Sequence, residues 1–313
     1  MTLKSWKKYD AHTPVLLHEL TSSIQIHTKQ NIIVDCTLWA GWHAREVLEH
    51  MHPWDIFIWF DADGDNLTKA ETLLQNFGKG VEKIFVHANY WRLEEELKKR
   101  SITNVTGIYY DLGLSSMHLD QAEKGFSFRI EGPLDMRLDK TGGIRASDIV
   151  NSYPLKKLED IFLSYGEEPR SKQIAKAIEA YRAKKRFETT TELAEVIEKI
   201  SYHPQTKARI FQAIRIEVNK ELEQLEKSLY SAIKLLESGG NIFVISFHSL
   251  EDRIVKHIFK KESTDCICDD IICTCKHKKQ LEVVHKKPIL PTEEETKENT
   301  RSKSAKGRHA RKI

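Results

Sequence analysis

Short apolar runs alternate with amphipathic stretches through the first third of the chain. The apolar runs predict strands at residues 31–36, 55–61, 83–87 and 105–111, and the stretches between them predict helices at 41–51, 66–77 and 90–100. Buried strands that alternate with helices form parallel sheets covered by helices. The pattern therefore predicts the α/β class, with a doubly wound sheet.

The alternation stops after this region. Residues 126–211 show helical periodicity at 155–164, 169–184 and 191–200, and a longer helical stretch covers 210–236 before a strand pattern returns at 239–246. We therefore expect an α/β domain interrupted by an inserted helical domain. The expected divisions are 1–125 for the first part of the α/β domain, 126–211 for the insertion, 212–290 for its second part and 291–313 for a basic C-terminal tail.

Composition excludes some classes of protein. No apolar run approaches the ~20 residues that span a bilayer, and the first residues lack the apolar core of a secretory signal. We therefore expect a cytoplasmic protein that does not act in a membrane. The net charge is only +3, which does not by itself indicate nucleic-acid binding.

The basic residues are concentrated at the C-terminal end. The last thirteen residues contain six Lys or Arg side chains and no acidic one. Such a tail can neutralise phosphates of a nucleic acid. The alternative is a solvated, frayed terminus with no binding role.

Acidic residues end three of the four predicted strands. Asp35, Asp61 and Asp111 hold these positions, and Asn89-Tyr90 follows the remaining strand. One such acid is often only a helix cap. Ligands of open α/β sheets bind at the carboxyl ends of strands, where an acid commonly receives ribose hydroxyls. Together these positions favour a nucleotide-like cofactor.

Longer motifs lie beyond these strands. They read Asp111-Leu112-Gly113-Leu114-Ser115-Ser116, Gly132-Pro133-Leu134-Asp135-Met136-Arg137, Tyr165-Gly166-Glu167-Glu168, Phe211-Gln212-Ala213-Ile214-Arg215-Ile216 with Val218-Asn219, and Ile245-Ser246-Phe247-His248-Ser249-Leu250-Glu251-Asp252-Arg253. With them, nearly the whole chain from His12 onward resembles the bacterial ribosomal small subunit methyltransferase H family, which methylates cytosine N4 in 16S rRNA.

The resemblance implies a fold, a cofactor and a partner. The fold is an S-adenosylmethionine-dependent methyltransferase domain with an inserted helical domain, and the partner is 16S rRNA in the small ribosomal subunit, methylated at a cytidine near the decoding site. By position, the implied cofactor contacts are Gly41, Trp42, His43, Asp61, Tyr90, Asp111 and His118. The family usually has phenylalanine and glutamine where this chain has Tyr90 and His118.

The resemblance also indicates residues for the reaction itself. Asp111 is the candidate catalytic residue, because an acceptor at this strand end could take a proton from the cytosine amine. The candidate RNA-side residues are Asp135, Arg137, Arg215, Asn219, His248 and Ser249. Each of them could instead hold the two domains together.

The loop after the first strand departs from the family pattern. Cys36, Trp39 and Trp42 replace glycines, and Trp59 replaces a residue that is usually glycine. Glycine is needed where backbone approaches a cofactor or adopts positive φ. One explanation is that the protein has lost its cofactor. The other is that the host reads UGA codons at positions 39, 42 and 59 as glycine, whereas the sequence here translates them as tryptophan. The intact Asp35, His43 and Asp61 favour the second hypothesis.

Four cysteines cluster near the C-terminal end. The pattern is Cys266-Ile267-Cys268, four residues, then Cys273-Thr274-Cys275. Four thiolates suit a tetrahedral structural zinc ion. The usual zinc knuckle has two residues between paired cysteines instead of one, so unpaired surface cysteines remain the alternative.

Two classes of function remain open. One is the methyltransferase, and the other is a non-catalytic RNA-binding or ribosome-assembly factor built on a methyltransferase fold that has lost cofactor binding. Cofactor binding separates these two hypotheses. The sequence leaves the oligomeric state undetermined.

Overall fold

The chain folds into two compact units. The computed structural model describes residues 14–39, 41–114, 119–268 and 274–313. One unit, the sheet unit, comprises Met1–Gly113 and Glu223–Ile313, and the other, the helical unit, comprises Leu114–Leu222. No helix of the described residues is long and apolar enough to cross a membrane.

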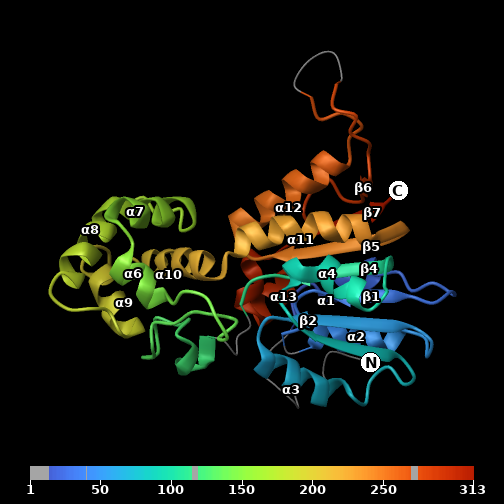
Figure 1. The fold of residues 1–313 in the computed structure, drawn as a ribbon, viewed down its shortest axis with the longest axis horizontal. Helices are drawn as coiled ribbons and strands as arrows, with labels where there is room; N and C mark the ends of the chain where they lie inside the picture. Colours follow the sequence, from blue (N-terminus) through green and yellow to red (C-terminus); the bar gives the residue numbers. More distant parts are fainter. Residues whose placement is uncertain (1–13, 40, 115–118, 269–273) are drawn as a thin grey trace. The chain divides into compact units, whose positions relative to one another are not determined.

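The sheet unit is organised by a seven-stranded sheet (Figure 1). Its strands are β1 (Ile32–Asp35), β2 (Ile56–Asp61), β3 (Glu82–His87), β4 (Val105–Asp111), β5 (Leu236–Ser246), β6 (Leu281–Val283) and β7 (Lys306–Lys312). Their spatial order is β3-β2-β1-β4-β5-β7-β6, and β7 runs antiparallel to both of its neighbours. The ladders from β3 to β5 are parallel, so the expected doubly wound α/β sheet is confirmed.

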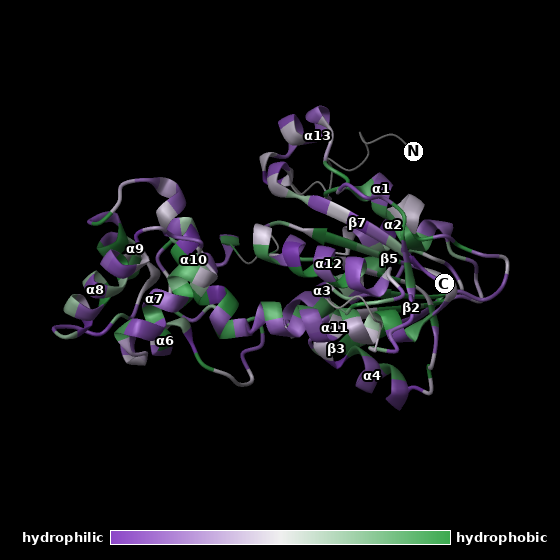
Figure 2. Cartoon of the chain, turned by 90° about the horizontal axis from the view of Figure 1, so that it is seen from above, coloured by the Kyte–Doolittle hydropathy of each residue, from purple (hydrophilic) through white to green (hydrophobic). Residues whose placement is uncertain are grey.

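Helices cover both faces of this sheet. Along each central strand, alternate side chains enter different apolar cores, as in β4, where Tyr109 faces one core and Tyr110 the other. One core is closed by α1 (Leu17–Ser23), α2 (Trp42–His50) and α3 (Gly64–Leu74), and the other by α4 (Leu93–Lys99), α11 (Glu221–Leu235) and α12 (Ser249–Glu262). Figure 2 shows the matching alternation of polar and apolar residues around helices such as α11.

The helical unit has a core of its own. Its elements are η3 (Ala122–Lys124), α6 (Ala146–Ser152), α7 (Leu155–Ser164), α8 (Ser171–Arg182), α9 (Thr190–Glu198) and α10 (Pro204–Asn219). Buried residues of these helices pack with Phe126, Leu134 and Met136 from the preceding irregular segment. The expected helical insertion is therefore present as a separate core, although its limits in the structure are 114 and 222, not 126 and 211.

The long helical stretch expected at 210–236 is two helices. Lys220 adopts a left-handed conformation with φ 51° and ends α10, and α11 begins at Glu221. The beginning of α10 lies six residues before the expected position, where Pro204 occupies the first turn. Proline suits a first turn because its missing N–H would have no helical partner there.

The C-terminal segment differs most from the sequence-based expectation. Instead of a tail over 291–313, the chain forms α13 (Glu293–Glu298), η4 (Thr300–Ser304) and then β7, which pairs with β5 from Asn241↔Arg311 to Ser246↔Lys306. The Glu295 carboxylate accepts a hydrogen bond from Leu16 N at 2.8 Å and so ties α13 to the start of α1. The basic residues of β7 therefore belong to a folded strand.

We expect truncation after Arg301 to destabilise the protein strongly. The deletion would remove β7 from between β5 and β6 and expose the apolar edge of β5. Denaturant unfolding of the full chain and of the truncated chain should show loss of the cooperative transition in the latter. A chain that lacks only Ile313, which is largely exposed, is the control and should unfold like the full chain. Equal stability of the long truncation would contradict this role of β7.

Candidate functional site

Three carboxylates gather at one edge of the sheet. In the parallel ladders Asp35 pairs with Trp59 of β2 and Tyr109 of β4, so Asp61 and Asp111 lie two residues further along their own strands. All three residues end their strands at the carboxyl edge. This edge is where open α/β sheets bind ligands.

Asp35 is fully occupied by protein contacts. Its Oδ1 accepts a hydrogen bond from Thr37 N at 2.9 Å, and its Oδ2 accepts one from the Tyr109 hydroxyl at 2.8 Å. Thr37 Oγ1 in turn accepts a hydrogen bond from Asp111 N at 2.5 Å. Burial raises the pKa of Asp35 to about 7 despite these bonds. Asp35 therefore fixes the loop after β1 against the end of β4.

Asp61 and Asp111 each keep one buried oxygen without a hydrogen bond. Among the described residues nothing pairs with Asp61 Oδ2 or Asp111 Oδ1. Burial raises the pKa of Asp61 to about 7, and burial together with the charge of Glu251 raises the pKa of Asp111 to about 8. A buried acceptor without a donor is costly, so both oxygens are suited to a ligand that supplies hydroxyl or cationic groups.

His43 connects the start of α2 to Asp111. Its Nε2 lies 2.9 Å from Val15 O, and its Nδ1 lies 3.4 Å from Asp111 Oδ2. Burial lowers the pKa of His43 to about 4, so the ring is neutral near pH 7. A neutral ring that donates from Nε2 to Val15 O has an acceptor at Nδ1, which can share a proton with the Asp111 carboxyl group.

The loop between β1 and α2 has the backbone of a glycine-rich turn. Gly41 adopts φ 75°, and a Cβ at this position would lie 3.2 Å from the Leu74 side chain. Trp39 adopts φ 47°, a left-handed conformation that side chains disfavour. Its indole Nε1 donates a hydrogen bond to Asp111 O at 2.5 Å, so the indole extends from this loop to the end of β4.

The other two tryptophans at expected glycine positions are buried. Trp42 is the first residue of α2 and is 6% exposed. Trp59 is fully buried in the core on the α1–α3 face, where it stacks on Phe85 with ring centroids 4.6 Å apart. No described residue accepts a hydrogen bond from its Nε1, which is unfavourable for a buried N–H group.

Tyr90 lies at the end of β3, as expected. Asn89 caps the short helix η2 (Tyr90–Arg92) through a hydrogen bond from Trp91 N, and the Tyr90 ring packs edge-on against Tyr110 at 5.7 Å. The other expected cofactor residue, His118, lies outside the described residues, as do Ser115 and Ser116 of its motif.

The loop after β5 reaches the same edge of the sheet. His248 precedes α12, and Glu251 accepts hydrogen bonds from Phe247 N at 2.8 Å and His248 N at 3.2 Å. Gly113, with φ 100°, lies against the Phe247 ring, where a Cβ would come within 3.2 Å. The candidate residues His248 and Ser249 thus begin a helix next to the end of β4.

The four candidate RNA-side residues of the helical unit make well-defined internal contacts. Asp135 and Arg137 form an ion pair at 2.7 Å. Asn219 accepts a hydrogen bond from Leu138 N and donates one to Met136 O, while Arg215 makes two bonds of 2.8 Å to the Glu221 carboxylate. These contacts order the segment at 135–138 and the end of α10, and an RNA role for them stays a prediction.

Three of the four clustered cysteines come together. Ligand atoms of Cys266, Cys268 and Cys275 lie within 4.8 Å of one another, and Cys273 lies outside the described residues.

Sequence reasoning missed three residues at the sheet edge: Thr37, Tyr109 and Glu251. Thr37 and Tyr109 act across the ladder, so only the register of β1 against β4 could have indicated their role. Glu251 forms a local capping box at the start of α12, and its spacing from His248 was the available sequence signal.

Comparison with known proteins agrees with this architecture. The model of the MraW methylase family matches residues 10–313. A Dehalococcoides mccartyi protein named ribosomal RNA small subunit methyltransferase H is 46% identical over 96% of this chain and 86% of its own length. Proteins of the same name from Caldicellulosiruptor saccharolyticus and Clostridioides difficile are 44% and 41% identical, over 96% of this chain and 99% of theirs.

Similarity to solved structures is weaker. A putative rRNA-methylase from Clostridium thermocellum aligns over 95% of both chains with 11% identity and a TM-score of 0.44, which is too low to support a functional conclusion. The assignment therefore follows from the sequence match over nearly the whole length: the chain belongs to the MraW methylase family.

Proposed function

We propose that this protein transfers a methyl group from S-adenosylmethionine to the exocyclic N4 of a cytidine in 16S rRNA, near the decoding site of the small ribosomal subunit. The names of its relatives, which share 40–46% identity with it, support an rRNA of the small subunit as the substrate. A ribosomal substrate implies that the protein acts in the cytoplasm.

The observation that carries this proposal is the pair of unsatisfied carboxylate oxygens at the carboxyl edge of the sheet. Asp61 Oδ2 is suited to ribose hydroxyls, because the end of the second strand is where acids receive them. Gly41 is the N-cap of α2 and has no side chain to cap the helix. The N–H groups at the helix start are therefore left for a carboxylate. These donors and acceptors fit the methyl donor, with Tyr90 as the aromatic residue beside its base.

The remaining chemistry is the handling of one proton. S-adenosylmethionine supplies an electrophilic methyl group, so the amine nitrogen gains a bond to carbon while the carbon–sulfur bond breaks. The amine must then lose a proton. Asp111 and His43 form the proton-accepting pair in this proposal, because Asp111 Oδ2 and His43 Nδ1 lie 3.4 Å apart. A cationic ligand beside Asp111 would favour its ionised, accepting form.

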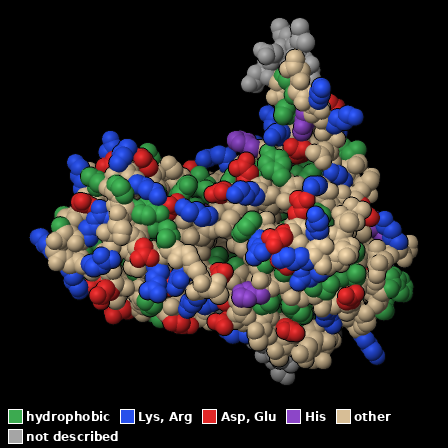
Figure 3. Space-filling view, in the orientation of Figure 1, with side chains coloured by type: hydrophobic (Ala, Val, Ile, Leu, Met, Phe, Trp, Pro, Cys, Tyr) green, Lys and Arg blue, Asp and Glu red, His purple; other side chains and the backbone are tan. Residues whose placement is uncertain are grey.

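RNA contacts in the proposal come from both units. The candidates are Asp135, Arg137, Arg215, Asn219, His248 and Ser249. Since the first four are engaged in internal contacts, they position backbone and neighbouring side chains for the RNA. Figure 3 shows Lys and Arg side chains interspersed with acidic ones over the face it draws.

Among the replaced glycines, Trp39 most directly favours the non-catalytic alternative. Its indole is bonded to Asp111 O, where the methyl donor would lie. Its left-handed backbone, however, is the conformation of a glycine. We propose that the native protein carries glycine at positions 39, 42 and 59, and that the loop then accepts the donor.

The first prediction concerns the reaction. Small subunits from a strain that lacks the endogenous enzyme should gain N4-methylcytidine near the decoding site when incubated with the protein and labelled S-adenosylmethionine. Nucleoside analysis by mass spectrometry measures the product, and an Asp111→Asn variant is the control and should give none. Methylation of free nucleosides without methylation of subunits would refute the proposed substrate.

The second prediction concerns Asp61. Its pKa is raised on folding, so its favourable contribution is present at low pH and is lost as the pH rises through about 7. Asp61→Asn should therefore stabilise the ligand-free protein above pH 7 relative to the wild type, and should do so much less at about pH 5. Thermal unfolding at both pH values measures this.

The same variant should bind the cofactor product more weakly. Loss of a buried carboxylate acceptor should cost about 1–3 kcal/mol of affinity for S-adenosylhomocysteine, measured by calorimetry. The exposed Asp65 is the matched control, and Asp65→Asn should change neither quantity. Unchanged binding by Asp61→Asn would remove Asp61 from the site.

The third prediction concerns the tryptophans. Peptide mass spectrometry of the protein from its own host should find glycine at positions 39, 42 and 59. Trp39→Gly alone should raise affinity for S-adenosylhomocysteine, since it frees Asp111 O and removes the indole from the end of β4. Trp91→Ala, at a partly exposed tryptophan outside the loop, is the control. Tryptophan in the native protein would instead support the non-catalytic alternative.

A further inference from the structure

A 17-residue excursion leaves the sheet unit between α12 and β6. Residues 263–279 are here called the cysteine arm, and its described parts, 263–268 and 274–279, extend beyond the end of α12 in Figure 1. The arm is closed at its base by hydrogen bonds from Gln280 N to Glu262 O at 2.8 Å and from Lys279 N to Asp265 Oδ1 at 3.3 Å. His277 Nε2 also lies 3.1 Å from Lys261 O. The two ends of the arm are therefore fixed to the folded protein.

The arm has no apolar core to order it. Among its described residues, 263–268 and 274–279, none is buried and none belongs to a helix or strand. Ordering each residue costs about 1–2 kcal/mol of backbone entropy. The hydrogen bonds at the base involve Asp265, His277 and Lys279, so Cys266, Cys268 and Cys275 lie beyond the part of the arm that these bonds fix.

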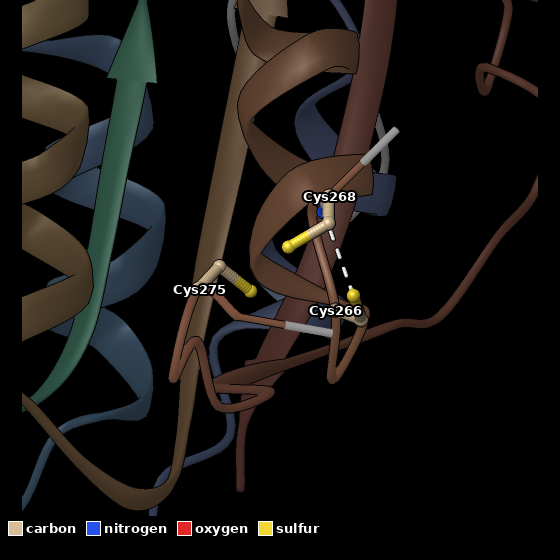
Figure 4. A group of neighbouring side chains, drawn as sticks. All are labelled: Cys266, Cys268 and Cys275. Carbon is tan, nitrogen blue, oxygen red and sulfur yellow. Dashed lines mark hydrogen bonds between the residues drawn. The ribbon is translucent and has the colours of Figure 1, made fainter. Parts of the chain in front are cut away.

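Three thiols converge inside the cysteine arm. Cys266, Cys268 and Cys275 place their sulfur atoms within 4.8 Å of one another (Figure 4). Cys266 and Cys268 belong to the part of the arm that leaves α12, and Cys275 belongs to the part that returns to β6. At a Zn–S distance of about 2.3 Å, the sulfur atoms of a tetrahedral site lie ~3.8 Å apart, so a small contraction of the trio would close such a site.

Backbone N–H groups point at two of these sulfur atoms. Cys268 N lies 3.4 Å from Cys266 Sγ, and Thr274 N lies 3.4 Å from Cys268 Sγ. Outer hydrogen bonds of this kind orient metal ligands and support their charged form. Lys276, Lys278 and Lys279 follow directly in the sequence and add positive charge next to the thiols.

We propose that Cys266, Cys268 and Cys275 bind a zinc ion as a structural site that orders the cysteine arm. Zinc fits because soft thiolates select it and because thiolate-rich zinc sites are commonly structural. The three thiols release their protons on binding, and no redox change is required. The site is independent of the methyl-donor site, since it belongs to a different segment and supplies no group to the sheet edge.

Zinc content of the full-length protein tests this proposal. The protein is purified without chelators, and zinc is measured by plasma mass spectrometry against protein concentration. We expect one zinc per chain, and loss of most of it in Cys268→Ser. The matched control is Cys36→Ala, which removes a cysteine that is buried in the sheet core and should leave zinc content unchanged.

Two further measurements separate a designed site from adventitious binding. X-ray absorption at the zinc edge should show at least three sulfur ligands. Hydrogen exchange should show that amides of residues 263–279 lose protection when zinc is removed, while amides of β4 and β5 keep theirs. This second readout does not depend on methyl transfer, so it remains informative if the proposed function fails.

Three outcomes would overturn the proposal. They are zinc content equal in the wild type and in Cys268→Ser, fewer than three sulfur ligands at the zinc, and a disulfide between two of these cysteines in protein isolated with immediate alkylation.

Discussion

The burial of three carboxylates at one sheet edge is the constraint on which the rest of this structure depends. Asp35 and Asp61 are buried, the Asp111 side chain is 14% exposed, and loss of solvation raises the pKa of each carboxyl group. Among the described residues, no Lys or Arg side chain lowers these pKa values. The ligand-free protein therefore holds acids that are protonated or strained near neutral pH, and a ligand that supplies hydroxyls and positive charge would relieve them.

Asp35 shows how the fold supports that arrangement. Its two oxygens are bonded to Thr37 N and the Tyr109 hydroxyl, so it holds the loop and leaves ligand binding to the other two acids. The ends of β1 and β4 are thereby locked together, and Asp111 is presented to His43. An acid that the sequence suggests as a cofactor contact can therefore act instead by holding the loop beside the candidate site.

The sequence predicted β1, β2, β4 and β5 well because most of their residues are buried, whereas the edge strand β3 is buried only in part. Buried strands read as continuous apolar runs, and the acids that end them are visible in the sequence. The same reasoning failed for β7, which reads Lys306-Gly307-Arg308-His309-Ala310-Arg311-Lys312. Its charged residues reach partners that no local pattern indicates: Lys306 and Arg308 pair with Asp252 of α12. Tertiary ion pairs made a polar segment into an internal strand.

The sequence indicated which residues lie at the candidate site but not the hydrogen bonds that connect them. Strand ends identified Asp61 and Asp111, whereas the hydrogen bonds through Thr37 and Tyr109 depend on the register of β1 against β4. In the helical unit, Asp135 pairs with Arg137, and Arg215 pairs with Glu221. Asn219 of α10 donates a hydrogen bond to Met136 O and so joins α10 to the motif segment.

Trp39 unites these arguments. A φ of 47° is disfavoured for a residue with a side chain and is readily adopted by glycine. The loop nevertheless keeps two turn contacts, in which Thr37 N donates to Asp35 and Gly41 N donates to Leu38 O. The backbone at position 39 therefore suits a glycine, and the indole there occupies the place where the proposed methyl donor would lie.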